Sequence, residues 1–466
     1  MVAIANPSPG GAGELEILDA NRDIRNNVEN TVFGFFISGY AGRLPTTIDS
    51  FPEQGFGYVY GSGDGSFTRI SYGTESVVGA VSGLPPASDS IATISSAQQV
   101  YSATSTSAAV VIVDNTTGRS YALNVPGAQH IVSNVGGTVV LVTTRNTNNL
   151  YRIVKLSNNV LPPSGTYTDC EPLTLPVFCV VPVNNVPGNP ATNNVAFDRP
   201  IGVVFSLDGS TAYVLNCGPE CGGTASGITA LDAGLLTEQT IPTLTAPSPV
   251  VVYPGLANGK LNVPGGVTVG LTDGNNLYVA GQELLTAGNT TTGLFAGLAP
   301  AIGQFTGVFS TISLTAATPV VTSAYRVPDG THSSMIFADD NTLWIGSTLC
   351  ATGANGFLAA SLPAGTINLN CLAAFTLGGT APPVVVPAVS PTNPVPFPNQ
   401  NNNQYYYGDL TGICWVQNLH KVYTAYGGQI HAFYTNNLTE INNGQITIQG
   451  TAENVVYMDA LTNAAN

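Results

Sequence analysis

The chain has 466 residues, of which 44% are hydrophobic and only 8% are charged, so it can bury a large core and bulk disorder is excluded. Its 27 Asp and Glu residues against 12 Lys and Arg give a formal net charge of −15. A surface so poor in cations cannot neutralise many phosphates, which argues against nucleic acid and anionic lipid as partners. Uncharged Asn, Thr, Ser and Gly must cover the surface instead, a composition common in surface-layer, adhesive and fibre-forming proteins.

At the N-terminus, residues 1–30 are predicted to form an extended segment that precedes the main domain. Residues 1–7 lack the basic region and the apolar stretch of a signal peptide. The only candidate helix in the chain, and a weak one, is the charge-rich stretch 14–30. No stretch approaches the roughly 18 apolar residues that span a bilayer, so no transmembrane segment is predicted.

From about residue 31 onward, one unit recurs along the chain. It consists of a short apolar strand, a turn of Gly, Asn or Asp, a second strand with aromatic and aliphatic residues, and a more polar third strand. The clearest copies of the hairpin are 201–216, 267–280, 334–346 and 412–425, with a weaker copy at 131–143. The turn residues supply the positive φ that a two-residue hairpin needs, and the alternation of apolar residues indicates half-buried antiparallel strands.

Three or four antiparallel strands per repeat predict an all-β fold, a single β-propeller with seven blades over residues 31–460 and a tail at 461–466. The units lie near 31–75, 97–126, 128–157, 197–245, 263–321, 327–376 and 405–440. The apolar run 454–458 is expected to complete the sheet of the first blade. Insertions rich in Pro, Asn and Thr occur at 158–196, 284–306 and 378–404. A tandem array of β-sandwiches is the alternative fold.

Residues 199–216 resemble the YVTN-type repeat of seven-bladed propellers in bacterial secreted proteins, surface lipoproteins and cell-surface layers. Residues 5–11 and 216–223 also resemble a subgroup of bacterial propeller lipoproteins, in which the Pro-rich start follows a lipidated cysteine. The repeat resemblance extends over about 127–440. It implies a propeller fold and an extracellular or cell-surface location, but no particular activity, because propellers host many functions.

Six of the seven cysteines fall into close pairs within or beside irregular segments that contain Gly or Pro. Disulfides are predicted for these pairs, which are Cys170 with Cys179, Cys217 with Cys221, and Cys350 with Cys371. The alternative is zinc, with Cys217 and Cys221 as half a site, but no His is close in sequence. Cys414 lies in an apolar run and is predicted to be a buried free thiol. These cysteines favour a secreted protein whose signal peptide lies outside this numbering.

The sequence contains no nucleophile elbow, P-loop, dinucleotide fingerprint or haem-attachment motif. Residues that precede the innermost strands would converge at the mouth of a propeller channel, and these include His130, Asp198, His332 and Asp409. Two imidazoles and two carboxylates could bind a divalent metal or perform acid–base chemistry. The interpretation we favour is that they cap strands and contact neighbouring loops. We therefore predict no catalytic residue, no metal ion and no cofactor.

Two further groups of residues have weaker signals. We interpret the acidic turns 64–66, 208–210 and 339–341 first as hairpin turns and only second as calcium ligands. None of them has the alternating ligands of a calcium loop. Asn115, Asn289 and Asn437 lie in Asn-x-Thr sequons, which matter only in a host that glycosylates them.

Three functions remain open at this point. The favoured one is a non-catalytic extracellular structural protein, a propeller that assembles with copies of itself into a filament or surface layer. The alternatives are a monomeric surface module that binds glycan or protein, and a propeller lyase or hydrolase with a metal at the channel mouth. For the favoured function we predict head-to-tail contacts through residues 1–13 and the insertion 378–404, because a donated extended segment can add a strand to an open sheet edge.

Overall fold

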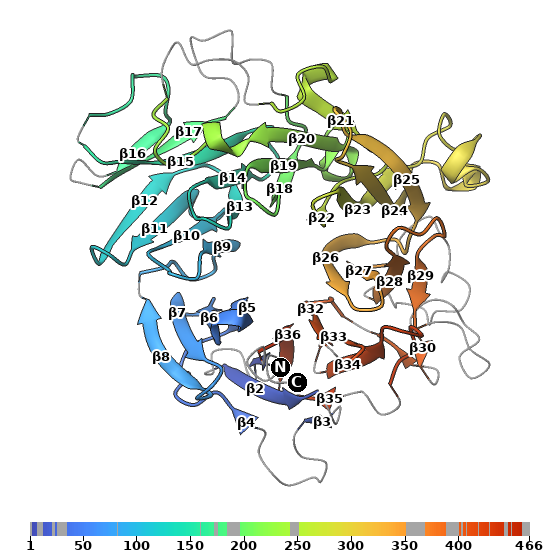
Figure 1. The fold of residues 1–466 in the computed structure, drawn as a ribbon, viewed down its shortest axis with the longest axis horizontal. Helices are drawn as coiled ribbons and strands as arrows, with labels where there is room; N and C mark the ends of the chain where they lie inside the picture. The colour runs from blue at the N-terminus through green and yellow to red at the C-terminus, as the bar shows by residue number, and fades with distance from the viewer. Residues whose placement is uncertain are drawn as a thin grey trace. The chain divides into compact units, whose positions relative to one another are not determined.

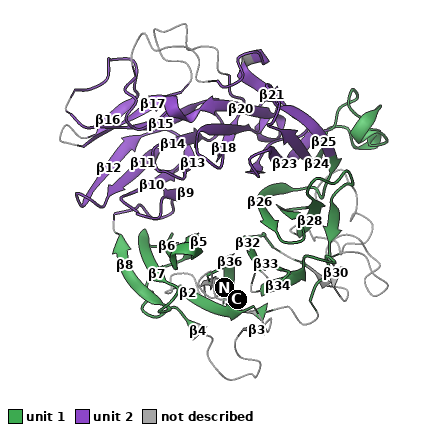
Figure 2. Cartoon of the chain, in the orientation of Figure 1, with its two compact units in different colours: residues 1–82, 285–308, 325–466 green, residues 83–284, 309–324 purple. Residues whose placement is uncertain are grey.

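The computed structural model describes residues 2–6, 13–20, 24–25, 35–81, 83–158, 160–171, 176–183, 196–242, 251–350, 369–387, 400–401, 404–406, 408–417, 419–427, 429–441, 446–448 and 450–458. The chain divides into two compact units, shown in Figure 2. Unit 1 comprises residues 1–82, 285–308 and 325–466, and unit 2 comprises residues 83–284 and 309–324. The units are described separately below.

The predicted all-β class is confirmed, and the fold is a β-propeller. Within the described ranges the only helices are short 3₁₀ turns, and the strands form antiparallel sheets (Figure 1). Seven sheets of four or five strands are each built from one continuous stretch of chain, and they correspond to the seven predicted repeats. None of the helices in this part of the chain is long and apolar enough to cross a membrane.

Unit 1 contains three of these seven sheets. The first contains β5 (Pro45–Phe51), β6 (Phe56–Gly61), β7 (Ser66–Ser71) and β8 (Ser76–Val81). The second contains β26 (Thr331–Ala338), β27 (Thr342–Thr348), β28 (Asn370–Thr376) and β29 (Val384–Val386). The third contains β32 (Gly412–Val416), β33 (Lys421–Tyr426), β34 (Gln429–Tyr434) and β35 (Ile446–Thr447). A separate pair consists of β30 (Gln400–Asn401) and β31 (Gln404–Tyr405).

Unit 2 contains three complete sheets and most of a fourth. The first contains β9 (Ser90–Thr93), β10 (Gln99–Thr104), β11 (Ala109–Asp114) and β12 (Arg119–Asn124). The second contains β13 (Ala128–Ser133), β14 (Val140–Thr144), β15 (Leu150–Leu156), β17 (Val177–Pro182) and β16 (Asp169–Glu171). The third contains β18 (Pro200–Phe205), β19 (Thr211–Asn216), β20 (Gly227–Asp232) and β21 (Lys260–Asn262). The fourth contains β22 (Val269–Thr272), β23 (Asn276–Leu284), β24 (Phe305–Ser313) and β25 (Val320–Arg326).

The 3₁₀ helices lie in the connections between these strands. They are η1 (Pro52–Gln54), η3 (Gly218–Cys221), η4 (Ala233–Leu235), η5 (Ala257–Gly259), η6 (Gly293–Phe295) and η7 (Ala299–Ala301). The last two occupy part of the predicted insertion 284–306, where Phe295 packs with Leu285 and Val308 in a small apolar cluster.

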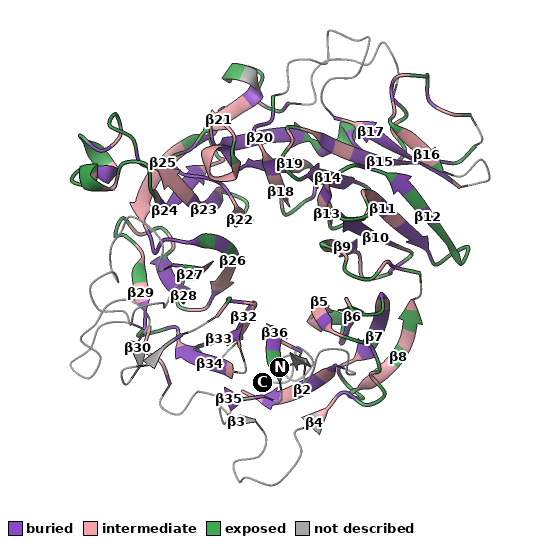
Figure 3. Ribbon diagram, turned by 180° about the vertical axis from the view of Figure 1, so that it is seen from behind, coloured by how far each residue is buried: buried purple, intermediate pink, exposed green. Residues whose placement is uncertain are grey.

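Position within a sheet decides how much of a strand is buried. Every residue of the middle strands β19 and β33 is buried or nearly so, whereas the outermost strand β12 alternates, with Tyr121 and Leu123 buried between exposed neighbours (Figure 3). Adjacent sheets cover both faces of a middle strand. They cover only one face of an outermost strand, so its side chains alternate between buried and exposed. Within unit 1, for example, Trp344 on β27 packs with Val422 and Phe433 of the next sheet.

The two ends of the chain form an additional sheet in unit 1, which we call the terminal sheet. It contains β1 (Val2–Asn6), β2 (Glu14–Asp19), β3 (Ile24–Arg25) and β36 (Thr451–Val456) in the order β3-β2-β1-β36, with β4 (Phe35–Phe36) also paired with β2. Leu18 and Val455 pack towards the β32–β35 sheet, while Leu15 and Met458 pack towards the β5–β8 sheet. The terminal sheet therefore lies between two of the seven repeat sheets and is an eighth sheet of the same kind within the described chain.

The terminal sheet corrects one expectation. The run 454–458 does not complete the sheet of the first repeat, because β36 pairs with β1 rather than with β5. In the stretch 14–30, which the sequence offered only as a weak helix candidate, the described residues form the strands β2 and β3. The apolar residues at 15, 17 and 18 contact cores on both faces of this sheet.

Candidate functional site

The three predicted disulfides are all present. They join Cys170 to Cys179, Cys217 to Cys221 and Cys350 to Cys371. Cys170 and Cys179 are direct partners in the register of β16 and β17, so this bond fastens an outermost strand to its sheet. Cys414 is buried, and burial raises the pKa of its thiol to about 12. Three disulfides indicate that the protein folds in an oxidising environment.

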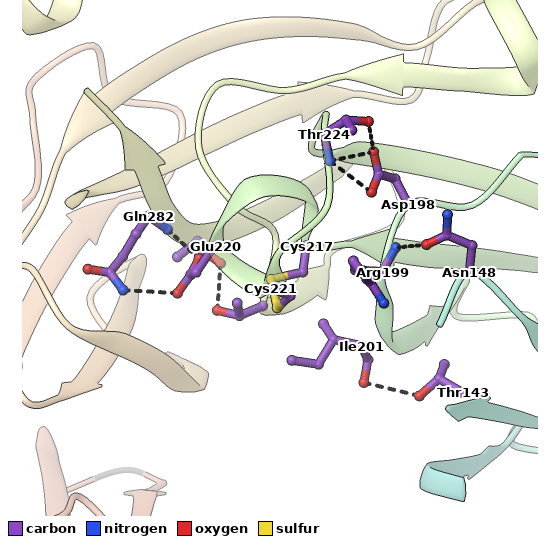
Figure 4. Close-up of a disulfide and its surroundings, with 12 residues drawn as sticks. Thr143, Asn148, Asp198, Arg199, Ile201, Cys217, Glu220, Cys221, Thr224 and Gln282 are labelled. Atoms are coloured by element: carbon purple, nitrogen blue, oxygen red, sulfur yellow. Dashed lines mark hydrogen bonds between the residues drawn. A yellow bond between two sulfur atoms is a disulfide. The ribbon is translucent and has the colours of Figure 1, made fainter. Parts of the chain in front are cut away.

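The short loop closed by Cys217 and Cys221 lies between β19 and β20 of one sheet in unit 2 (Figure 4). Within it, Gly218 adopts a φ of 62° and lies so close to Ser226 that no side chain fits there. The carboxylate of Glu220 reaches the end of β23, where Oε2 accepts a hydrogen bond from the Gln282 backbone N–H at 2.7 Å and Oε1 accepts one from Gln282 Nε2 at 3.0 Å. Burial raises the pKa of Glu220.

Asp198, one of the four candidates from the sequence, belongs to the same region. Its carboxylate accepts hydrogen bonds from the Thr224 backbone N–H at 3.0 Å, from Thr224 Oγ1 and from the Ala225 backbone N–H at 2.7 Å (Figure 4). Burial alone would raise the pKa of Asp198, but these hydrogen bonds lower it below the ordinary value. The side chain holds the loop that follows the disulfide and is poorly suited to exchange protons.

The other three candidates lie in three different sheets. His130 is on β13, where burial lowers its pKa, and no described group hydrogen-bonds to its Nδ1. His332 is on β26 and is buried, which lowers its pKa to about 4. Asp409 is exposed and precedes β32. None of the four candidates belongs to a group of three potential metal ligands among the residues searched in this structure.

Such a group does exist, and sequence reasoning did not assemble it. Asp339 and Asp340, in the turn between β26 and β27, meet His420 from the turn between β32 and β33. His420 Nδ1 lies 3.0 Å from Asp339 Oδ2 and 2.8 Å from Asp340 Oδ2. The acidic turn 339–341 was noted in the sequence, but nothing local indicated the imidazole, which is 80 residues further along the chain.

The other acidic turns are hairpin turns, as predicted. Asp208 Oδ1 accepts hydrogen bonds from the Ser210 backbone N–H at 3.0 Å and from Ser206 Oγ at 2.6 Å. Asp64 accepts one from the Ser66 backbone N–H at 3.0 Å and another from the Arg43 backbone N–H at 3.1 Å. These carboxylates are engaged within their own hairpins or the adjoining segment.

The terminal sheet is the second candidate site, because it contains residues 2–6, part of the segment 1–13 that was predicted to contact a neighbouring copy. In this structure these residues pair with β2 and β36 of their own chain. β1 lies between β36 and β2, with Ala3 opposite Val455 on one side and Glu16 on the other. The residues between the strands, 7–13, include two Pro and three Gly. The second predicted contact, the insertion 378–404, lies partly outside the described residues. Its described part includes β29, where Val384 is 48% exposed.

Comparison with known proteins assigns neither a family nor an activity to this chain. No protein family and no curated protein matches the sequence. Among solved structures, the dihydro-heme d1 dehydrogenase NirN is 11% identical, with a TM-score of 0.49 over 98% of this chain and 75% of its own. The Cps50 (Swd1) β-propeller domain of Myceliophteria thermophila is 11% identical, with a TM-score of 0.45 over 86% of this chain and 95% of that domain's chain. Hydrazine synthase of Kuenenia stuttgartiensis is 15% identical, with a TM-score of 0.39 over 67% of this chain and 77% of its own. Membership of the YVTN-type family stays a prediction.

Proposed function

We propose that this chain is a non-catalytic, extracellular structural propeller, and that its copies assemble by exchanging the N-terminal strand β1. The observation that supports this proposal is the position of β1 in the terminal sheet. The five-residue strand β1 lies between β36 and β2 and pairs with both. Without β1, both of those strands would present unpaired edges, which are templates for a strand from another chain.

The contacts of β1 can be made equally well between two copies. A strand in the middle of a sheet is held mainly by backbone hydrogen bonds, which need no particular side chain. The sequence at 7–13 contains two Pro and three Gly, residue types that disfavour strand pairing, and β1 is a separate short strand that ends at Asn6. When each copy gives β1 to one neighbour and receives it from another, the contact is heterologous and propagates into a filament unless rotation closes a ring.

Two further observations favour a scaffold over an enzyme. The Asp198 carboxylate is engaged by Thr224 and Ala225, and His332 is kept neutral by burial at physiological pH, so neither is poised for acid–base chemistry. The three disulfides stabilise loops and an outermost strand, as expected of a protein that must persist in an oxidising space outside the cytoplasm.

Cross-linking between two different variants tests strand exchange. Ala3 and Val455 are register partners, so one protein carries Ala3→Cys and a second carries Val455→Cys. The two are unfolded together under conditions that keep the native disulfides, refolded as a mixture and mildly oxidised. Strand exchange predicts a covalent species that contains one chain of each variant. Val384→Cys, on an exposed position of β29, replaces Val455→Cys in the matched control and should give no such product.

A second experiment asks whether exchange builds the assembly. Ala3→Pro removes a backbone donor from the middle of the sheet and should abolish polymers in electron micrographs, whereas Ala3→Val should retain them. The proposal is wrong if the intact protein stays monomeric at high concentration and the 3–455 bond forms only in a chain that carries both cysteines. A monomeric module that binds glycan or protein would then replace it.

A further inference from the structure

We propose that Asp339, Asp340 and His420 form a binding site for a first-row divalent cation of the Zn²⁺ type. This inference does not depend on strand exchange, because it concerns two hairpin turns within unit 1. The potential ligand atoms of the three residues all lie within 4.8 Å of one another. Two carboxylates and one imidazole are ligands that Zn²⁺, Mn²⁺ and Co²⁺ accept, whereas Ca²⁺ favours oxygen ligands only.

The first argument is that one imidazole nitrogen faces two carboxylates. His420 Nδ1 is 2.8 Å from Asp340 Oδ2, in hydrogen-bond geometry, and 3.0 Å from Asp339 Oδ2. A single N–H donates one good hydrogen bond, and Asp340 receives it. A protonated imidazole would also leave the group with a net negative charge, whereas a divalent cation with a neutral imidazole balances both carboxylates.

The second argument is the environment of the Asp339 carboxylate. Both of its oxygens are inaccessible to solvent, and no described group donates a hydrogen bond to either one. A carboxylate without solvent or donors is costly unless a cation neutralises it. His420 supplies only an ion-pair contact that it shares with Asp340. A metal ion bound between the three side chains would give Asp339 a cation in direct contact, in addition to the imidazole that it shares with Asp340.

The third argument is a comparison with turns of the same kind. The carboxylates of Asp208 and Asp273 are engaged by backbone N–H groups and side chains of their own hairpins, and so serve the turn itself. In the turn between β26 and β27, Asp340 instead accepts hydrogen bonds from Thr435 Oγ1 at 2.6 Å and from His420, both in the next sheet. The carboxylates of this turn are directed at a neighbouring sheet and towards a common point.

Thr435 is placed to position one of the ligands. Its hydroxyl donates to Asp340 Oδ2, and its backbone N–H donates to the His420 carbonyl at 2.9 Å, so it connects the two sides of the site. Outer partners of this kind hold the ligands of metal sites in place. His420 is 53% exposed, so solvent reaches the site and can complete the coordination of an ion held by three protein ligands.

Titration of the full-length protein with Zn²⁺ after treatment with EDTA tests the site. Isothermal calorimetry should show one saturable equivalent per chain, and Co²⁺ should give visible absorption bands characteristic of coordination by a mixed nitrogen and oxygen set. His420→Gln and Asp339→Asn should each lose the saturable equivalent, and Thr435→Val should weaken Zn²⁺ binding by about 10–100-fold. Circular dichroism establishes that each variant is folded.

Asp208→Asn is the matched control, because it alters an exposed turn aspartate outside the site. It should bind Zn²⁺ as the unaltered protein does. The proposal is overturned if the unaltered protein binds no more Zn²⁺ than His420→Gln does, or if Asp208→Asn removes binding equally. Binding of Ca²⁺ as tightly as Zn²⁺ by the unaltered protein would also overturn it, because a site to which an imidazole contributes prefers Zn²⁺.

Discussion

Glu220 and Gln282 are joined by two hydrogen bonds, one to the backbone N–H and one to the side-chain amide of Gln282, across 62 residues of sequence. Glu220 belongs to the loop closed by Cys217 and Cys221, whereas Gln282 lies on β23 in the next sheet. The disulfide loop therefore does more than stabilise itself. It presents one partly buried carboxylate that joins two sheets of unit 2 to each other.

Substitution of Glu220 should therefore destabilise the fold. Glu220→Ala removes both hydrogen bonds and leaves the partly buried N–H of Gln282 without its acceptor, so we expect a loss of about 1–3 kcal/mol in the free energy of unfolding. Glu220→Gln keeps an acceptor and should cost less. Denaturant unfolding followed by fluorescence measures both values. An unchanged midpoint for Glu220→Ala would show that the loop is not structurally coupled to β23.

A methyl group at Gly281 should be poorly tolerated. A Cβ there would lie 1.9 Å from the carbonyl oxygen of Gly266, which is backbone and cannot rotate away. Gly281→Ala should therefore cost about 1–3 kcal/mol or more through overpacking. Gly255→Ala is the control, because a Cβ at Gly255 meets nothing within 4 Å. Thermal unfolding of the two variants should differ by several degrees, and similar melting temperatures would contradict the prediction.

The burial of His332 predicts an acid-sensitive fold. Burial lowers its pKa from 6.5 to about 4, so between those two values the unfolded chain binds more protons than the folded one. Stability due to this group is therefore fully present above pH 6.5 and is lost as the pH falls towards 4, by up to about 1.4 kcal/mol per pH unit. Chemical unfolding measured at several pH values should show this slope, and His332→Gln should flatten it. A slope unaffected by His332→Gln would assign the sensitivity to other groups.

The bond between Cys350 and Cys371 should contribute to stability through the chain that it closes. It joins residues 21 positions apart and anchors the chain to β28, the third strand of its sheet. Replacement of both cysteines by Ser should lower the free energy of unfolding by about 2–4 kcal/mol, since the unfolded state gains freedom. Unfolding in guanidinium chloride measures the loss. Added reductant should lower the stability of the double variant less than that of the unaltered protein. An equal loss in both proteins would contradict a stabilising role for the bond between Cys350 and Cys371.

Local sequence patterns predicted those features of the fold that depend on residues close to one another in the sequence. The hairpin around Asp208 and Gly209 is an example, because an Asx side chain and a glycine at a φ of 72° define the turn wherever it occurs. The cysteine pairs are similar, since members of each pair are close in sequence and lie in segments that need fastening. Seven repeat sheets and three disulfides followed from such short-range information.

Long-range pairings were not predictable in the same way. Val2 pairs with Val456, and no property of either short apolar run specifies the other as its partner. Asp339 and His420 meet because two successive sheets bring their first turns together, so their proximity depends on packing that the sequence does not state. The sequence predicted that His332 lies at a channel mouth, and only the packing of the folded chain shows that its ring is buried.

The terminal sheet also orders the events of synthesis. A ribosome releases Val2 to Asn6 long before Thr451 to Val456, so β1 waits for its second partner, β36, while the repeat sheets are synthesised. Pairing across so many residues carries a loop-closure cost and is expected to form slowly, after the repeat sheets. Each newly made chain thus passes through a stage in which β1 is held on one side at most. Under the strand exchange proposed above, this interval is the one in which a strand from another copy can be accepted.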